Sequence, residues 1–240
     1  GMTIASAAMT SALDLKNAST FSALGLSVSN TGPDTSMSGD FGITSGSPSG
    51  SSFAISGANH VADSEASQAM LDIQSAYNDG ISRPSTSNLA GDLAGVTLFP
   101  GVYSSGGAAI SQSITLTFDA GGVSSSVFII KIGGAFSTAA TSNMVLANGA
   151  QAKNIFWLVG GAVGFATRAH AVGTFISVGA LSLGDGATIN GRTLSFAALN
   201  LYNNVLSGAV SASAQAVIDA AQAAAAQAAA AQAVIDAANA

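Results

Sequence analysis

The sequence predicts a mainly β protein built as a solenoid, in which short turns of chain stack on one another. Between Phe156 and Leu201, an apolar residue recurs every eighteen residues, as at Leu158, Ile176 and Leu194. Within each repeat, large apolar and small side chains alternate, which is typical of a strand with one buried side. Eighteen residues are too few for a pair of helices but suit about three short strands. These observations favour a β-helix over a β-sandwich with coincidental spacing.

The composition is poor in charge, which limits the partners that we expect. Only 8% of the 240 residues are charged, against about 25% in a typical soluble domain. The net charge is −6 with six basic residues, so we expect neither nucleic acid nor an anionic membrane surface as a partner. We also expect no membrane insertion, because no run of large apolar residues is long enough. Cysteine is absent, which excludes a structural disulfide and a thiolate metal site.

Short strands are expected on both sides of a single helix. The first alternating stretch begins at Phe21 and turns at the Asn-Thr-Gly-Pro sequence of residues 30–33. Residues 37–43 form a second strand region, and the Ser- and Gly-rich residues 44–60 are expected to form a loop or cap over the open end of the solenoid. After the helix, we expect strands at residues 96–98, 102–103, 114–118, 127–132 and 144–146.

Residues 63–79 change to the helical period. Their apolar residues form one stripe, and these are Ala66, Ala69, Met70, Ile73, Ala76 and Tyr77. Asp63 or Ser64 can cap the start, and Gly80 can end the helix. The repeat supplies a partner surface, because residues 156–159 are apolar on both sides of one strand. We therefore expect the helix to lie along that face, parallel to the solenoid axis, rather than on an end of the solenoid.

Residues 212–240 are expected to form a separate helix. The octet Ala-Gln-Ala-Val-Ile-Asp-Ala-Ala occurs at 214–221 and again at 231–238, with Ala runs between the two copies. Because Ala has the best helix propensity, an unbroken helix about 40 Å long is expected here. It could pack on the domain, pair with a copy of itself, or project into solvent.

The sequence shows no pattern typical of catalysis or metal binding. An enzyme on a β-helix would need clustered carboxylates, a metal or an activated nucleophile, but the twelve acidic residues are scattered and Glu65 is the only Glu. His60 and His170 fall in loop-like stretches with no Cys or paired acid nearby, so we expect solvated histidines and no metal site. We therefore assign no catalytic and no cofactor-binding residue.

The repeat also predicts a flat and uncharged surface. Its outward residues are small in three successive repeats, and they are Ala162, Ala180 and Ala198 in one row and Gly164, Ser182 and Asn200 in the next. Strands stack about every 4.8 Å, and ice presents water oxygens at a similar repeat. Small methyl and hydroxyl groups can hold ordered water that merges with the ice lattice, whereas a charge would hold water in the wrong geometry. The alternative is that these residues only permit close packing of a neighbouring element, such as the Ala-rich tail.

Six short motifs occur in order over about residues 18–206. They are Asn30-Thr31-Gly32-Pro33, the helix end Ala76-Tyr77-Asn78-Asp79, Pro100-Gly101-Val102-Tyr103, Val127-Phe128-Ile129, the stretch from Asn148 to Trp157, and Asn190-Gly191-Arg192. Together they resemble the large microbial ice-binding protein family of bacteria, fungi and sea-ice algae. The resemblance implies a right-handed, discontinuous β-helix of triangular section with one α-helix alongside. It also implies secretion, no cofactor, and ice as the ligand.

Many proteins of that family carry a Thr-Ala-X-Thr-like motif in each rung of the ice-binding face. The positions that match it here are 161–164, 179–182 and 197–200, where the Ala is kept and the threonines are absent. The pattern and the resemblance together predict eight ice-binding residues, and these are Ala162, Gly164, Gly179, Ala180, Ser182, Ala197, Ala198 and Asn200.

The sequence is expected to divide into three parts. Residues 1–17 form an N-terminal extension, residues 18–208 the ice-binding β-helix domain with the helix at 63–79, and residues 209–240 an Ala/Gln-rich helical extension. The leading hypothesis is a secreted antifreeze protein that is not an enzyme, that inhibits ice growth and recrystallisation, and that could self-associate through its C-terminal helix. No intact signal peptide is expected in this chain, because no basic region follows its start.

Two other hypotheses remain open. One is a β-helical adhesion or surface module that binds polysaccharide or its own copies. The other is a polysaccharide lyase or hydrolase, which would require a cluster of carboxylates that the sequence does not predict.

Overall fold

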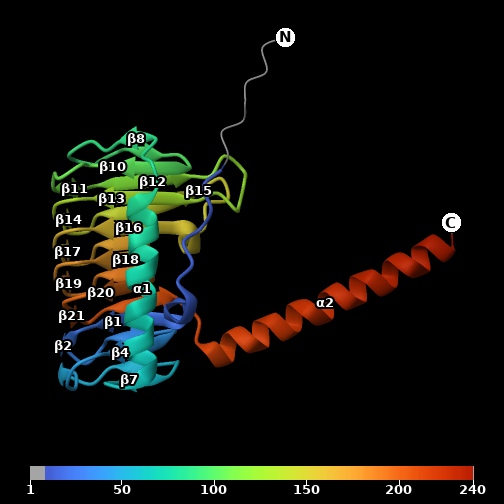
Figure 1. Ribbon diagram of the computed structural model, residues 1–240, viewed down its shortest axis with the longest axis horizontal. Helices are drawn as coiled ribbons and strands as arrows, with labels where there is room; N and C mark the ends of the chain where they lie inside the picture. Colours follow the sequence, from blue (N-terminus) through green and yellow to red (C-terminus); the bar gives the residue numbers. More distant parts are fainter. Residues whose placement is uncertain (1–8, 240) are drawn as a thin grey trace, which may run out of the picture.

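The structure is mainly β, with two sheets of parallel strands and two α-helices (Figure 1). This computed structural model describes residues 9–239, so residues 1–8 of the expected N-terminal extension and residue 240 lie outside the described residues. The larger sheet has fifteen strands, which are β1 (Phe21–Gly25), β3 (Ser36–Met37), β4 (Asp40–Ile43), β6 (Ala54–Ile55), β7 (Asn59–Val61), β8 (Ser87–Asn88), β9 (Thr97–Leu98), β10 (Gly101–Ser104), β12 (Thr115–Asp119), β13 (Phe128–Ile132), β15 (Asn143–Ala147), β16 (Ile155–Val159), β18 (His170–Ser177), β20 (Thr188–Ser195) and β22 (Val205–Gly208). The smaller sheet has seven strands, which are β2 (Ser27–Thr31), β5 (Ser49–Gly50), β11 (Ile110–Gln112), β14 (Phe136–Thr138), β17 (Val163–Phe165), β19 (Leu181–Leu183) and β21 (Ala198–Tyr202).

The eighteen-residue repeat of the sequence is the register between neighbouring strands. Leu158 pairs with Ile176, and Ile176 pairs with Leu194, so the predicted column is confirmed. In the smaller sheet, Val163 pairs with Leu181 and Leu181 with Leu199. Each repeat therefore places residues of the same kind directly beside one another on neighbouring parallel strands.

Strands β18 and β20 bend and divide the larger sheet into two halves. The second half of β18 pairs with β16, whereas its first residue pairs with β15. At the bend, Gly173 pairs with Gly191 and both have positive φ angles, +113° and +151°. A β-carbon on Gly191 would lie 1.8 Å from the carbonyl oxygen of Gly173. Only glycine allows two successive turns to approach so closely at this corner.

The main core lies between the two halves of the larger sheet and the smaller sheet. Trp157 of β16 stacks on Phe136 of β14 and on Phe175 of β18, with ring centroids 4.7 and 5.2 Å away. Phe118 of β12 meets Trp157 edge-on at 5.9 Å. The indole Nε1 donates a hydrogen bond to the carbonyl oxygen of Val172 at 3.1 Å, so the buried polar group of Trp157 is satisfied. All three sheet surfaces thus contribute to one core.

The first strands of the chain lie beside its last strands. Ala23 of β1 pairs with Thr193 of β20, and Val28 of β2 pairs with Leu199 of β21. Strands β4 and β5 then follow on the other side of β1 and β2. The order of strands in the sheets therefore differs from their order in the sequence.

Helix α1 (Ser64–Ser82) returns the chain from one end of the stacked strands to the other (Figure 1). It follows β7, precedes β8, and its 19 residues span about 28 Å. Its buried side packs on outward apolar residues of the larger sheet, and this second cluster includes Ala66, Ala69, Ile73 and Ala76 of the helix and Phe156, Leu158, Ile176 and Leu194 of the strands. The prediction that the helix lies along this face is confirmed.

The start of α1 agrees with the prediction, but its end does not. The side chain of Asp63 accepts a hydrogen bond from the Ala66 N–H at 2.8 Å and caps the helix. Gly80 was expected to end the helix, yet it lies inside it. A β-carbon there would lie 2.3 Å from Leu158 Cδ1, so this glycine permits close packing on β16. The helix ends at Ser82, two residues before Pro84, which cannot continue it.

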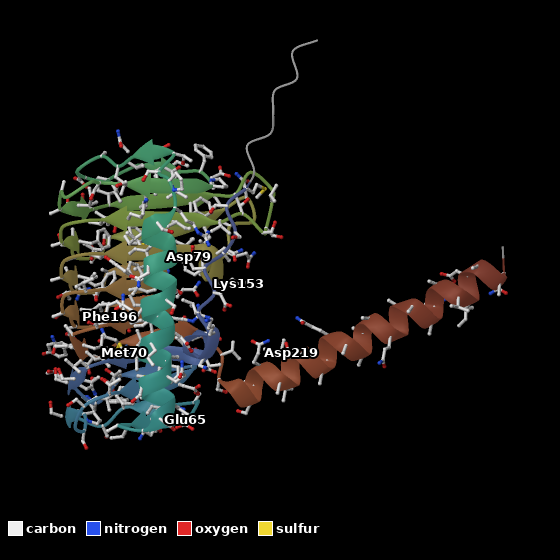
Figure 2. All side chains as sticks on the ribbon, in the orientation of Figure 1. Glu65, Met70, Asp79, Lys153, Phe196 and Asp219 are labelled. Atoms are coloured by element: carbon white, nitrogen blue, oxygen red, sulfur yellow. The ribbon has the colours of Figure 1, made fainter. Side chains whose placement is uncertain are left out.

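Helix α2 (Ala212–Ala238) projects away from the strands (Figures 1 and 2). Its residues are exposed from Ser213 to Asn239, and Ser211 caps its start by accepting a hydrogen bond from the Ala214 N–H at 3.3 Å. Two short 3-10 helices, η1 (Lys16–Thr20) and η2 (Ala152–Asn154), complete the secondary structure of the described residues. No helix in the described part of the chain is both long enough and apolar enough to span a membrane.

Substitution of the corner glycine tests this packing. Gly191→Ala should lower the free energy of unfolding by about 3 kcal/mol, because the methyl group meets a carbonyl oxygen and the backbone keeps a positive φ. Gly164→Ala is the control, since nothing lies within 4 Å of its added β-carbon. Urea unfolding followed by circular dichroism measures both, and equal midpoints for the two variants would contradict the close approach.

Candidate functional site

The outer surface of the seven-stranded sheet carries a straight column of small polar residues. Strand register places one residue of each strand in this outer column, and in strand order these are Ser111, Ser137, Gly164, Ser182, Asn200, Ser29 and Ser49. On every strand except β5, the residues before and after them, such as Val163 and Phe165, are buried. None of the seven strands contains a charged residue. The sheet therefore presents a regular surface without charge.

Hydrogen bonds between side chains align part of the outer column. The Ser29 hydroxyl donates to Asn200 Oδ1 at 2.8 Å, and Asn200 Nδ2 donates to the Ser182 hydroxyl at 3.0 Å. These bonds join three neighbouring strands at positions separated by about 4.8 Å per strand. The side chains of this segment are therefore held in place before any ligand arrives.

A row of alanines lies beside the outer column, at the beginning of the strands. Ala162, Ala180 and Ala198 each precede a buried core residue, so their methyl groups lie on the same side of the sheet as the outer column. The carbonyl oxygens of Ala162 and Ala180 accept hydrogen bonds of 2.9 Å from the N–H groups of Phe136 and Val163 on the preceding strands. Ala162 is exposed and the other two are half-buried. Methyl and hydroxyl groups thus lie in adjacent parallel lines.

Two of the eight predicted residues lie at the corner rather than on the sheet. Gly179 and Ala197 precede β19 and β21 by two and one residues and are half-buried. A β-carbon on Gly179 would lie 2.8 Å from the backbone nitrogen of Ala162, so this glycine has a packing role. The other six predicted residues lie together on one surface.

Sequence reasoning missed four members of the outer column. Ser111 and Ser137 belong to strands whose spacing, 26 residues, departs from the eighteen-residue repeat. Ser29 and Ser49 belong to N-terminal strands, and Ser29 lies 171 residues from its partner Asn200 in the sequence. A search for a serine between two apolar or buried positions of a strand, without a fixed period, could have found Ser29 and Ser137. It could not have shown that they lie in the same column as Gly164 and Asn200.

The expectation that both histidines lie in loops is wrong. His60 lies in β7 and His170 in β18, and both are half-buried. His60 Nδ1 is 2.8 Å from Asp63 Oδ2, so a paired acid is also present. His170 Nδ1 is 2.9 Å from Thr188 Oγ1, and burial lowers the pKa of His170. Both histidines therefore take part in local structure.

His60, Asp63 and Glu65 are close enough to hold a metal ion, with potential ligand atoms within 4.8 Å of one another. Their positions have another explanation. Asp63 Oδ1 caps α1 and Oδ2 contacts His60, while Glu65 accepts from Ser64 at 2.9 Å in the first turn. Carboxylates are favoured at a helix N-terminus because its dipole is positive there, and the same dipole disfavours a cation. This cluster therefore serves the start of α1.

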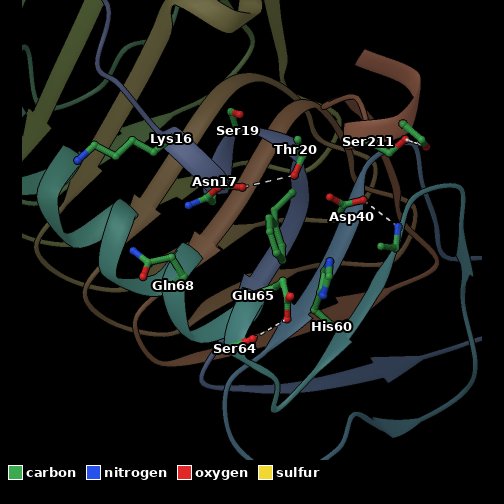
Figure 3. A pocket seen from close by; sticks show the side chains of 13 residues that line it. Lys16, Asn17, Ser19, Thr20, Asp40, His60, Ser64, Glu65, Gln68 and Ser211 are labelled. Atoms are coloured by element: carbon green, nitrogen blue, oxygen red, sulfur yellow. Dashed lines mark hydrogen bonds between the residues drawn. The ribbon is translucent and has the colours of Figure 1, made fainter. Parts of the chain in front are cut away.

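A cavity of about 830 Å³ adjoins this cluster, between η1, β7 and the start of α1 (Figure 3). Its polar side chains include Lys16, Asp40, His60 and Glu65. Asp40 is buried and accepts a hydrogen bond from the Ala58 N–H at 2.7 Å. His60 and Glu65 contact neighbouring side chains, so these polar groups serve local structure, and no activated nucleophile is among the four.

Comparison with known proteins identifies the family. The sequence profile described as Ice-binding-like matches residues 23–207. The chain belongs to the ice-binding-like family. The predicted family is therefore confirmed, and the matched region contains both sheets from β2 to β22 with α1, whereas α2 lies outside it.

Individual ice-binding proteins are similar to this chain over most of its length. An ice-binding protein of Nostoc sp. (strain HG1) is 36% identical over 75% of this chain and 68% of its own length. One of Flavobacterium frigoris (strain PS1) is 35% identical over 58% of this chain and 50% of its own length. The chain thus spans about half to two-thirds of these relatives.

Solved structures of ice-binding proteins have the same fold. The protein of the Antarctic ascomycete Antarctomyces psychrotrophicus has a TM-score of 0.79 at 34% identity, and the match covers 82% of this chain and 98% of that one. An ice-binding protein from an Antarctic biological consortium also has a TM-score of 0.79, at 32% identity, over 85% of this chain and 95% of that one.

The helix cap gives a pH-dependent prediction. Burial acts to raise the pKa of Asp63, but hydrogen bonds from the Ala66 N–H and His60 outweigh it and lower the pKa below its usual value. Asp63→Ala should therefore cost about 1 kcal/mol at pH 7. The difference from the wild type should begin to shrink below about pH 4, where the carboxyl of the unfolded chain takes up a proton, and should be smallest once pH falls below the lowered pKa of the native carboxyl. Unfolding free energies measured from pH 2 to 8 check this, with Asp63→Asn as the control that keeps a cap without titrating. A constant difference across that range would contradict it.

Proposed function

We propose that this chain is an ice-binding antifreeze protein that adsorbs to ice through the outer surface of the seven-stranded sheet. The observation that carries the proposal is the outer column and its alanine row on seven strands without a charged residue. The proposed ice-binding residues are the eight named above, with the six on the sheet making direct contact and Gly179 and Ala197 at the adjoining corner. The family membership and the names of the relatives support ice as the ligand.

The mechanism follows from the regularity of this surface. Strands separated by about 4.8 Å repeat the same hydroxyl and methyl groups along one line. Water held between these groups can adopt positions that continue the ice lattice, and side chains that are already aligned lose little entropy on binding. Adsorbed protein then forces the ice front to curve between neighbouring molecules, which inhibits growth and recrystallisation.

We infer the finer architecture from the packing of the strands. Three sheet surfaces surround one core, and β1 and β2 lie between β20–β21 and β4–β5. These features support a right-handed, discontinuous β-helix of triangular section with rungs of about eighteen residues and α1 alongside. We propose residues 18–208 as its boundaries, with residues 1–17 and 209–240 as extensions.

We propose that the protein acts outside the cell. Ice outside cells is the target, so we propose that the protein is secreted, works without a cofactor, and is not a catalyst. Nucleic acids and membrane insertion have no place in this function. The polysaccharide-binding alternative gains no support from Trp157, the only tryptophan in the sequence, because its side chain is fully buried and cannot stack on a sugar.

We further propose that α2 pairs with α2 of a second copy. Val217 and Ile235 are 70% and 52% exposed, and their separation of eighteen residues is five helical turns, so both lie on one line of the helix. The residues on this line of the helix between Val217 and Ile235 are all alanines, namely Ala221, Ala224, Ala228 and Ala231. In an antiparallel pair centred on residue 226, Val217 meets the partner's Ile235.

Charge favours the antiparallel arrangement. Asp236 lies in the last turn of α2, where its own helix dipole is unfavourable for an acid. Antiparallel pairing brings Asp236 beside the first turn of the partner's helix, whose dipole attracts a carboxylate. Two ice-binding domains joined in this way would bind a crystal with higher avidity than one.

A bulky substitution tests the ice-binding surface. Gly164→Tyr should abolish thermal hysteresis without unfolding the protein, because its ring would stand above the outer column and nothing lies within 4 Å of the added β-carbon. Ala180→Tyr and Ala198→Tyr should act in the same way. The matched control is Thr117→Tyr on β12 of the larger sheet, which should leave hysteresis unchanged. Loss of activity in Thr117→Tyr with full activity in the other three would move the site to the larger sheet.

A second test concerns the pairing of α2. Ala224→Glu with Ala228→Glu places two charges on the line that joins Val217 to Ile235 and should give a monomer in sedimentation equilibrium. Ala226→Glu with Ala230→Glu adds the same charges on the opposite side of the helix and should leave a dimer. A wild-type chain that remains monomeric would reject pairing without affecting the ice-binding proposal.

A further inference from the structure

A second cavity, of about 220 Å³, lies where the loop that carries η2 meets the corner between β20 and β22. Gln151 and Lys153 line it from the loop, and Asn190 and Arg192 line it from β20. These residues come from two sequence motifs that the ice-binding surface does not use. The fold brings the two motifs together although Lys153 and Asn190 are far apart in the sequence.

Two positively charged side chains, Lys153 and Arg192, line this cavity. Lys153 and Arg192 are two of only six basic residues. Among the described residues, the ion pairs within 4.0 Å are His60–Asp63 and Arg83–Asp79. Neither cation of the cavity therefore has a carboxylate partner, while the chain as a whole carries twelve acidic residues.

Arg192 donates hydrogen bonds to two uncharged groups and has further N–H donors without a partner among the described residues. Its Nε donates to the carbonyl oxygen of Ser19 at 2.8 Å, and Nη1 donates to Thr174 Oγ1 at 3.0 Å. A guanidinium has five N–H donors, so three remain. Burial lowers the pKa of Arg192 to about 10, and the group is still charged at neutral pH. A desolvated charge without a counter-charge is costly, and an anion would offset that cost.

We propose that this cavity binds a free inorganic oxyanion such as phosphate or sulfate, between Arg192 and Lys153. The planar guanidinium fork matches two oxygens of an oxyanion, and the lysine ammonium adds a point charge. Asn190 supplies a neutral amide donor at the same cavity. The volume admits one such anion with some of its water.

The anion site is separate from the ice-binding surface. Arg192 belongs to the larger sheet and Lys153 to η2, whereas the outer column belongs to the seven-stranded sheet. Figure 2 shows Lys153 to the right of α1, whereas the strands of the seven-stranded sheet lie to its left in Figure 1. Because Arg192 also contacts Ser19, a bound anion would hold the segment around η1 against β20.

Calorimetric titration of the full chain with sodium phosphate, at constant ionic strength set by sodium chloride, tests the proposal. The wild type should bind one phosphate per chain in a saturable way. Lys153→Gln should weaken that binding by about fivefold through loss of one partly solvated charge. Lys153→Arg should restore it. Lys16→Gln is the matched control, because it removes the same charge from an exposed side chain at the other cavity and should leave phosphate affinity unchanged.

Two results would overturn the proposal. One is the absence of saturable phosphate binding to the wild type. The other is an equal loss of affinity in Lys153→Gln and Lys16→Gln, which would reflect net charge alone. Thermal hysteresis of Lys153→Gln should equal that of the wild type, which keeps this test independent of the ice-binding proposal.

Discussion

Successive turns of the chain approach each other so closely at their corners that only glycine fits there. At Gly173 and Gly191, and again at Gly161 and Gly179, the space for a side chain is filled by backbone of the adjacent turn. Backbone contact at these corners fixes the register of the strands between them. Because the strands share one register, residues at the same position of successive strands form columns. Core residues align with core residues, residues that face α1 align with one another, and outer residues do the same.

The two sides of each strand have different environments because one face of the larger sheet is covered. Leu158, Ile176 and Leu194 point towards α1, whereas Trp157 and Phe175 point into the main core. A strand buried on both sides must be apolar throughout, which accounts for the continuous apolar run at 155–159. The seven-stranded sheet has no helix over it in the family domain, so its outward residues are free to meet a ligand.

Charged and uncharged side chains occupy different parts of the surface. Uncharged hydroxyl, amide and methyl groups occupy the seven-stranded sheet, and the acidic groups near α1 serve its first turn. Lys153 and Arg192 lie together on another part of the molecule without a carboxylate between them. A surface that orders water as in ice and a cavity that attracts an anion need opposite electrostatics, and the fold keeps them on different elements.

Elements with a local or strictly periodic signal could be predicted from the amino-acid sequence. The eighteen-residue spacing gave the register of β16, β18 and β20, and the amphipathic stripe gave α1 with its Asp63 cap. All eight predicted site residues follow that same period, and six of them lie on the outer surface of the seven-stranded sheet. Ala-rich composition was enough to predict α2, because helix propensity is a property of the chain itself.

Features that depend on contacts between residues distant in the sequence became visible in the folded chain alone. The tertiary structure placed β1 and β2 beside β20 and β21, added Ser29 and Ser137 to the outer column, and kept Gly80 within α1 because β16 lies against it. It also joined Lys153 to Arg192 at one cavity. None of these follows from a local pattern, because each is set by which segments pack together in space, and that choice is made by the free energy of the whole chain rather than by any one segment.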